Sequence, residues 1–272
     1  MAAGFAYGRA NDLVERAQGS ARGFAGAFLG RALDLPERTA LSIALYDATT
    51  HTWYRADGLF DWEAEWLAKR LPPPPARVLV AAAGAGREAV ALLRRGYEVH
   101  AFDPAPSAVR DCRQRLGGRV HAIVSSYEDL SASVLEGVSA PEESLRHQRY
   151  DAVLLGWGSL CHVLDAAERQ RALRACAVLA PTGPLLCTFP MLQDGRPAGR
   201  GARLGRRFGD PITRLRGLQA SASGDIFIPA FGFRHHFAQT EIEQLAIGVG
   251  RRAEFDADAI GFRCVTFVSK PA

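Results

Sequence analysis

The sequence contains almost no lysine, little methionine and no long apolar run. All but two of its 33 basic residues are arginines, and the net charge is only +4 over 272 residues. No stretch of about 18 uncharged apolar residues occurs, so we expect no membrane-spanning helix and no membrane partner. The first residues mix Arg, Asp and Glu without an apolar stretch, so we expect no secretory signal.

Cysteine is also scarce. The five cysteines are odd in number, and none is spaced as Cys-x-x-Cys. This pattern argues against a disulfide framework and against a zinc ribbon, so we expect no metal site. Free thiols fit a reducing compartment, and the expected location is therefore the cytoplasm.

The remaining composition is that of an ordinary globular protein. Apolar residues make up 48% and charged residues 23% of the chain, and the length allows one large domain or one domain with an extension. Arginine is densest between residues 203 and 216. We interpret these arginines as a solvated surface, with a phosphate- or nucleic-acid-binding face as the alternative.

The N-terminal segment, residues 1–75, has helical patterns. Trp62 and Trp66 are four residues apart and share one helix face, and Pro72–Pro75 ends that helix. The sequence therefore predicts an N-terminal helical lid over residues 1–75 and a separate domain over 76–272.

Strand-like and helix-like patterns alternate from Arg77 onward. The expected strands are RVLVAAA, YEVHAF, RVHAIV, YDAVLLGWG and GPLLCTFP. Such alternation is typical of a doubly wound α/β fold with a mostly parallel sheet. Residues 190–224 are rich in Gly, Arg and Ser and are expected to form an insertion over the site. The last two strand patterns, RRAEFDAD and FRCVTFVSK, are expected to pair as a C-terminal β-hairpin.

A glycine turn follows the first expected strand. Gly84 and Gly86 flank Ala85 just before a helix, where glycine lets the backbone approach a ligand and helix N–H groups point at it. Asp103 ends the second strand, where a carboxylate can accept the ribose hydroxyls of an adenosine. This pattern does not separate NAD from S-adenosylmethionine.

The later segments separate the two ligands. VLVAAAGAGREAVALLRRGYEVHAFD, SSYEDL and YDAVLLGWGSLCHVL, followed by the closing hairpin, resemble the class I S-adenosylmethionine-dependent methyltransferases over residues 77–269. The resemblance implies a Rossmann-like, seven-stranded sheet, S-adenosylmethionine as cofactor and methyl transfer as the reaction. The cofactor-binding residues that it implies are Ala82, Gly84, Gly86, Asp103, Pro104, Ser126, Tyr127, Gly156 and Trp157.

Two positions depart from the family. The family usually has an acidic residue at Val80 and glycine at Ala82, and that carboxylate helps hold the methionine ammonium. Either another group holds the ammonium in this chain, or the amine is held differently.

Candidate site side chains lie in three segments. His162 follows the fourth strand, and His235 and His236 precede a late helix, so each is a candidate catalytic base or a packing residue. Trp53 and Tyr54 lie in a polar stretch of the N-terminal segment. Their rings are expected to contact the sulfonium by cation–π attraction, with helix–domain packing as the alternative.

The expected substrate is a small molecule with an oxygen or nitrogen nucleophile, methylated in a biosynthetic reaction. The Asn-Pro-Pro-Tyr motif of nucleic-acid amine methylation is absent, since Leu155-Gly156-Trp157-Gly158 stands there, and this disfavours nucleic acid. Three alternatives remain. They are a cyclase that releases methylthioadenosine, resembling the azetidine-carboxylate synthases, an NAD-dependent oxidoreductase and a non-catalytic ligand-binding protein. The sequence leaves the oligomeric state open.

Overall fold

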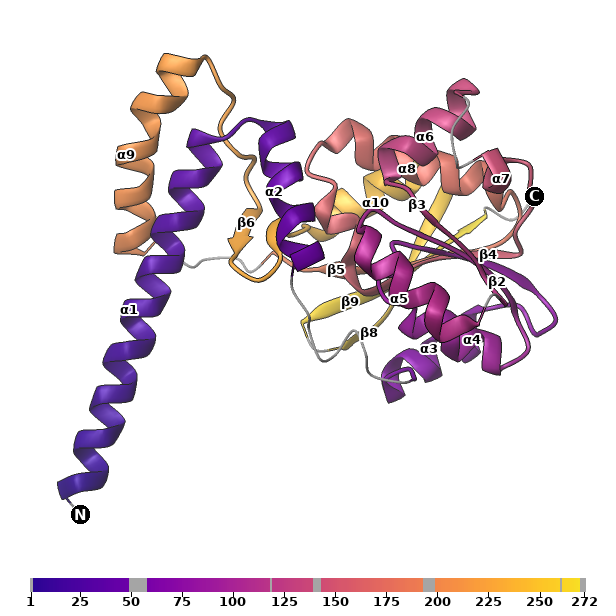
Figure 1. Cartoon of the computed structure of the whole chain (residues 1–272), viewed down its shortest axis with the longest axis horizontal. Helices are drawn as coiled ribbons and strands as arrows, with labels where there is room; N and C mark the ends of the chain where they lie inside the picture. The colour runs from indigo at the N-terminus through magenta and orange to yellow at the C-terminus, as the bar shows by residue number, and fades with distance from the viewer. Residues whose placement is uncertain are drawn as a thin grey trace. The chain divides into compact units, whose positions relative to one another are not determined.

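The computed structural model describes residues 2–48, 58–117, 119–138, 143–192, 199–259 and 261–269 (Figure 1). The chain divides into two compact units. Unit 1 combines Met1–Leu45 with Gln193–His235, and unit 2 combines Tyr46–Leu192 with His236–Ala272.

This division has a boundary near residue 45, whereas the sequence predicts one at residue 75, and the role of residues 1–75 as a lid stays a prediction. Helix α3 (Asp61–Arg70) is part of unit 2, because the buried side chains of Trp66 and Leu67 pack in one hydrophobic cluster with Val78 of the first strand. Residues 193–235, which include most of the insertion expected at 190–224, group with the N-terminal helices in unit 1. The expected position of this segment over the site stays a prediction.

Unit 2 contains a seven-stranded sheet in the order β3-β2-β1-β4-β5-β9-β8. Its strands are β1 (Arg77–Ala81), β2 (Glu98–Asp103), β3 (His121–Val124), β4 (Ala152–Leu155), β5 (Leu185–Pro190), β8 (Arg251–Ala259) and β9 (Phe262–Ser269). The first five strands are parallel, and β9 pairs antiparallel with both β5 and β8. The doubly wound, mostly parallel sheet with a C-terminal hairpin is therefore confirmed.

Helices cover both faces of this sheet (Figure 1). One face carries α3, α4 (Arg87–Arg94) and α5 (Pro106–Leu116), and the other carries α6 (Tyr127–Glu136), α8 (Ala166–Leu179) and α10 (Gln239–Ile247). Side chains of β1 alternate between the two cores, because successive residues of a strand point to opposite faces. Val78 and Val80 join the α3–α4–α5 core, whereas Leu79 and Ala81 join the α6–α8–α10 core. The short helix α7 (Glu143–Arg146) lies between α6 and β4 in the chain.

Unit 1 is built from helices and one hairpin. Its elements are α1 (Ala2–Ala32), most of α2 (Leu35–Ala48), α9 (Arg200–Arg216), β6 (Asp225–Ile228) and β7 (Gly232–His235), with β6 and β7 antiparallel. Helix α9 lies along α1, and a Cβ on Gly205 would stand 2.3 Å from the carbonyl oxygen of Phe24. Glycine disfavours isolated helices, so this close packing explains why a Gly- and Arg-rich segment forms one.

Two further observations concern membrane-spanning helices and cysteines in the described part of the chain. None of its helices combines the length and apolarity needed to cross a bilayer. All five cysteines are buried free thiols.

Candidate functional site

The turn between β1 and α4 has an unusual backbone. Ala82, Gly84 and Gly86 all have positive φ, of 50°, 55° and 83°. Gly86 is the residue just before α4, and a Cβ there would lie 2.6 Å from the Sγ of Cys112. Glycine is therefore required at 86 for both conformation and space, whereas Ala82 adopts a left-handed conformation that costs an alanine free energy.

Asp103 joins the end of β2 to this turn. One carboxylate oxygen accepts a hydrogen bond of 2.8 Å from the Gly84 N–H, and the other accepts one of 2.9 Å from the Ala105 N–H. The residue is only 3% exposed. Burial raises the pKa of Asp103 to about 6, although both backbone hydrogen bonds act to lower it. Each oxygen has a further lone pair with which it can accept a ligand hydroxyl.

The end of α2 is attached beside Asp103. The carboxylate of Asp47 accepts hydrogen bonds from the N–H and the hydroxyl of Ser107, in the first turn of α5. These bonds lower the pKa of Asp47, and its negative charge contributes to the raised pKa of Asp103. Trp53 and Tyr54 lie outside the described residues, so their contact with the ligand stays a prediction.

A buried ion cluster lies beside the glycine turn. Arg87 donates to both carboxylate oxygens of Glu63, at 2.5 and 2.7 Å, and to Glu88 at 2.6 Å. Its guanidinium stands over two aromatic rings, 4.8 Å from the Phe60 centroid and 5.4 Å from the Trp157 centroid. Burial raises the pKa of Glu88. The positive charge of Arg87 lowers this pKa, and the negative charge of Glu63 raises it further. The cluster thus pairs two buried carboxylates with one guanidinium.

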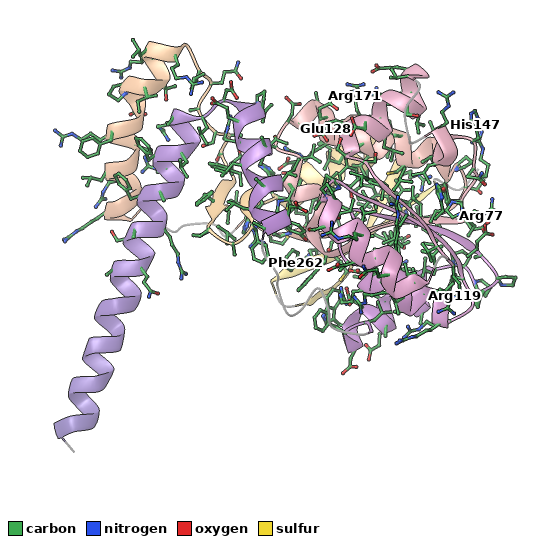
Figure 2. The ribbon with its side chains drawn as sticks, viewed as in Figure 1. Arg77, Arg119, Glu128, His147, Arg171 and Phe262 are labelled. Carbon is green, nitrogen blue, oxygen red and sulfur yellow. The ribbon has the colours of Figure 1, made fainter. Side chains whose placement is uncertain are left out.

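The end of β4 lies on the other side of β1 from the end of β2. Trp157 has φ 38° and ψ 52°, and Gly158 has φ 71°. A left-handed tryptophan is strained, and such strain is concentrated at ligand sites. The Trp157 ring packs against Phe60 and against Phe262 of β9, which Figure 2 labels, with centroids 5.5 and 6.2 Å apart. A Cβ on Gly156 would lie 3.1 Å from the Glu88 carboxylate, so this acid reaches the end of β4.

The structure brings most of the predicted cofactor residues to one edge of the sheet. β1 pairs with β2 on one side and with β4 on the other, so their carboxyl ends are neighbours. The predicted residues at this edge are Ala82, Gly84, Gly86, Asp103, Pro104, Gly156 and Trp157. In open α/β sheets this is where ligands bind.

Ser126 and Tyr127 already have partners within the protein. Ser126 precedes α6, and its hydroxyl accepts from the Asp129 N–H as a helix cap. Tyr127 is buried, its hydroxyl lies 2.7 Å from that of Ser159, and its ring packs edge-on against Phe102. Their contact with adenine stays a prediction.

The three candidate histidines each have a different partner. His235 belongs to unit 1, where its buried ring bonds Asp225 at 2.8 Å. His162 and His236 belong to unit 2. The His162 ring lies edge-on to Tyr46 with centroids 5.7 Å apart, and His236 lies 3.3 Å from the Met191 carbonyl oxygen. A catalytic role for any of them stays a prediction.

Sequence reasoning missed the ion cluster. Arg87 and Glu88 stand at the start of the apolar helix REAVALLR, a place where exposed charges are ordinary. No local pattern indicated the cluster, because the burial of nearly every residue of that helix is a property of the folded chain. Two adjacent charges on a buried helix need partners, and Glu63 supplies one.

The sequence was compared with known protein families and with curated proteins. Residues 79–187 match the family described as a methyltransferase domain. No curated protein matches the chain.

Several solved structures share the fold. A methyltransferase from Bacteroides fragilis in complex with S-adenosylhomocysteine is 16% identical, with a TM-score of 0.56, over 86% of this chain and 94% of its own. The CcbJ methyltransferase from Streptomyces caelestis is 15% identical, with a TM-score of 0.54, over 84% and 96%. The 1,6-didemethyltoxoflavin-N1-methyltransferase from Burkholderia thailandensis is 18% identical, with a TM-score of 0.52, over 86% and 87%. At these identities the likeness shows the fold.

Proposed function

We propose that this chain binds S-adenosylmethionine and methylates an oxygen or nitrogen atom of a small molecule, since residues 79–187 match the methyltransferase-domain family. The observation that carries the proposal is Asp103. It is a buried carboxylate at the end of β2, and it is bonded to the Gly84 N–H of the β1 turn. This is the arrangement that binds a ribose diol next to a backbone that permits close approach.

The other residues of this edge fit the same ligand. The positive φ of Gly84 and Gly86 lets the backbone pass close to the cofactor without side-chain interference. We assign Trp157, at the end of β4, as the aromatic contact of the sulfonium cation. When bound, S-adenosylmethionine supplies a methyl group that is already activated for attack. The chain therefore needs chiefly to position a nucleophile and to exclude water.

Glu88 is our candidate for the acid that is missing at Val80. The cluster of Glu63, Arg87 and Glu88 has one more carboxylate than guanidinium, and a buried surplus of negative charge favours a cationic partner. The Glu88 carboxylate lies within reach of Gly156 at the end of β4. An ammonium held by Glu88 stays protonated and has no free lone pair. This supports methyl transfer over the cyclase reaction, in which the methionine amine must attack the γ-carbon of the same methionine.

Roles in proton transfer follow from position. His162 belongs to the short helix that follows β4, so we assign it as the candidate base for a hydroxyl or ammonium nucleophile. Ala82, Pro104, Ser126 and Tyr127 are kept as proposed cofactor contacts. The similar toxoflavin enzyme acts on a small molecule, and the proposal extends that substrate class to this chain.

The test is calorimetric binding combined with product identification. We expect the protein to bind S-adenosylmethionine and to release S-adenosylhomocysteine when a small-molecule acceptor is supplied. Release of methylthioadenosine would instead indicate the cyclase. Binding of NADH with no binding of S-adenosylmethionine would overturn the assignment.

Glu88→Gln tests the ammonium contact separately. The variant should lose at least tenfold in affinity for S-adenosylhomocysteine but bind methylthioadenosine, which has no ammonium, as tightly as the wild type. Equal losses for both ligands would show that Glu88 acts only through the structure of the turn.

A further inference from the structure

Helix α9 exposes a stripe of apolar side chains. Leu204, Phe208 and Leu215 are 51%, 57% and 89% exposed, and Pro211 between them is exposed as well. These positions are spaced i, i+4, i+7 and i+11, so they share one side of the helix. Single exposed apolar residues are ordinary on a protein surface, but an aligned set of four on one helix marks an interaction site.

This stripe is not the side by which α9 packs on α1. That side is formed by glycines, and a Cβ on Gly201 or Gly205 would collide with the backbone of α1 at Ser20 or Phe24. The Phe208 ring touches the edge of Phe24, with centroids 6.3 Å apart, and more than half of the residue remains exposed. Figure 2 shows side chains that project from α9 away from α1. The packing that holds α9 in unit 1 therefore leaves the stripe available.

A second stripe beside the first is basic. Its exposed members are Arg200, Arg203, Arg207 and Arg214. Three of them directly precede an apolar residue of the first stripe, so the two stripes run side by side along α9. The helix has one acidic residue, Asp210, and its carboxylate is paired with Arg31 of α1. The exposed side of α9 is thus apolar along one line and positively charged along the next.

We infer that this surface of α9 binds an anionic phospholipid membrane, with the helix lying in the plane of the interface. Leu204, Phe208 and Leu215 enter the acyl boundary, and the arginines reach the phosphate groups through their long side chains. A nucleic acid would pair with the arginines but leave the apolar stripe in water. A second copy packed antiparallel about a twofold axis would place one basic stripe beside the other, which costs free energy. A negatively charged lipid surface complements both stripes.

Helix α9 attaches to the surface of the bilayer and does not cross it, and this attachment is independent of the reaction. The sequence predicts no membrane partner because it has no long apolar run, and α9 has none either. Glycine, arginine and isolated apolar residues alternate in the segment 200–216, so its two stripes are apparent only once the segment is known to be a helix packed by its glycines.

The experiment is flotation of the full-length protein with vesicles. Vesicles of pure phosphatidylcholine are compared with vesicles containing 30% phosphatidylglycerol, at low salt and at about 0.5 M salt, where surface charge is screened. We expect flotation with the anionic vesicles at low salt, weaker flotation at high salt and none with phosphatidylcholine. Equal flotation with both vesicle types, or none with either, overturns the inference.

Two variants locate the binding surface. Leu215→Ser removes the most exposed apolar residue and should lower the vesicle partition coefficient by about tenfold. The triple change Arg203→Gln, Arg207→Gln and Arg214→Gln should lower it by about a hundredfold. Because these side chains are exposed, the variants should melt at the wild-type temperature.

Matched controls replace an exposed aliphatic residue and three exposed arginines outside α9. Ile247→Ser replaces another exposed aliphatic residue, and Arg94→Gln, Arg149→Gln and Arg174→Gln together remove three exposed arginines of unit 2. Both controls should float like the wild type. Loss of binding in the controls as large as in the α9 variants would place binding elsewhere. A Leu215-dependent dimer in light scattering, without flotation, would identify a second copy as the occupant and overturn the inference.

Discussion

The carboxylate of Asp103 is hydrogen-bonded to the backbone N–H of Gly84 at 2.8 Å, so the end of β2 and the turn after β1 form one unit. The bond sets the orientation of the carboxylate without help from another charged side chain. It also places a group that binds hydroxyls beside a backbone that tolerates close contact. This pair affects the affinity for the ligand, and it affects how affinity and stability depend on pH.

Asp103→Asn should weaken binding of S-adenosylmethionine by about 2 kcal/mol, or roughly thirtyfold, because the ribose hydroxyls lose a charged acceptor. Calorimetry measures the effect, and circular dichroism checks that the variant is folded. Glu98→Gln is the control, since Glu98 is an exposed acid on the same strand. Unchanged affinity in folded Asp103→Asn would mean that the ligand does not contact this carboxylate.

Ligand affinity should depend on pH near 6. Burial, with the charges of Asp47 and Glu88, favours the protonated form of Asp103 and raises its pKa to about 6, whereas hydroxyl donors favour the ionised form. Affinity should therefore rise with pH and level off above about 6, falling by up to about tenfold for each unit below it. Isothermal titration in buffers of different ionisation enthalpy should show proton release on binding, and Asp103→Asn should remove this pH dependence.

The stability of the ligand-free protein should show the opposite slope. The pKa of Asp103 is higher in the folded state than its ordinary value of 3.8, so between pH about 4 and 6 the folded state holds a proton that the unfolded state has released. Stability from this residue therefore falls as pH rises through that window. Comparing denaturant unfolding of the wild type and Asp103→Asn at pH 4.5 and 7 isolates the contribution, and an identical difference at both values would contradict it.

Arg87→Met should lower the free energy of unfolding by about 3 to 5 kcal/mol, because it leaves Glu63 and Glu88 buried without their shared cation. The loss should shrink at low pH, where the carboxylates are neutral. Arg94→Met on the same helix is the matched control, since Arg94 is exposed. Equal losses for the two variants would show that the buried cluster adds no stability.

Ala82→Gly should stabilise the protein by about 0.5 to 1 kcal/mol. Ala82 has φ 50°, and the relief of that strain exceeds the extra chain entropy that glycine brings to the unfolded state. Ala83→Gly is the control, because its φ is negative, and it should destabilise. Thermal unfolding measures both, and a lower melting temperature for Ala82→Gly would show that the methyl group is needed for packing.

Local patterns in the sequence were enough for the sheet and for the glycine turn. The alternation of apolar strands and helices predicts a doubly wound sheet. The hydrophobic period and the length of each segment are local properties of the sequence and do not depend on how the segments pack. The position of Gly84, Gly86 and Asp103 at the ends of two neighbouring strands could be predicted for the same reason. Their conformational and hydrogen-bonding roles depend on the ends of two neighbouring strands, and parallel strands bring those ends together.

Tertiary structure alone decided how distant segments combine. Residues 193–235 join the N-terminal helices because the glycines of α9 fit closely against α1, a contact across some 180 residues that no local pattern encodes. His235 and Asp225 meet across the β6–β7 hairpin, and Glu63, Arg87 and Glu88 share one buried charge cluster. Burial of a charge depends on what packs around it, so a sequence marks the charge but only the folded chain supplies its partner.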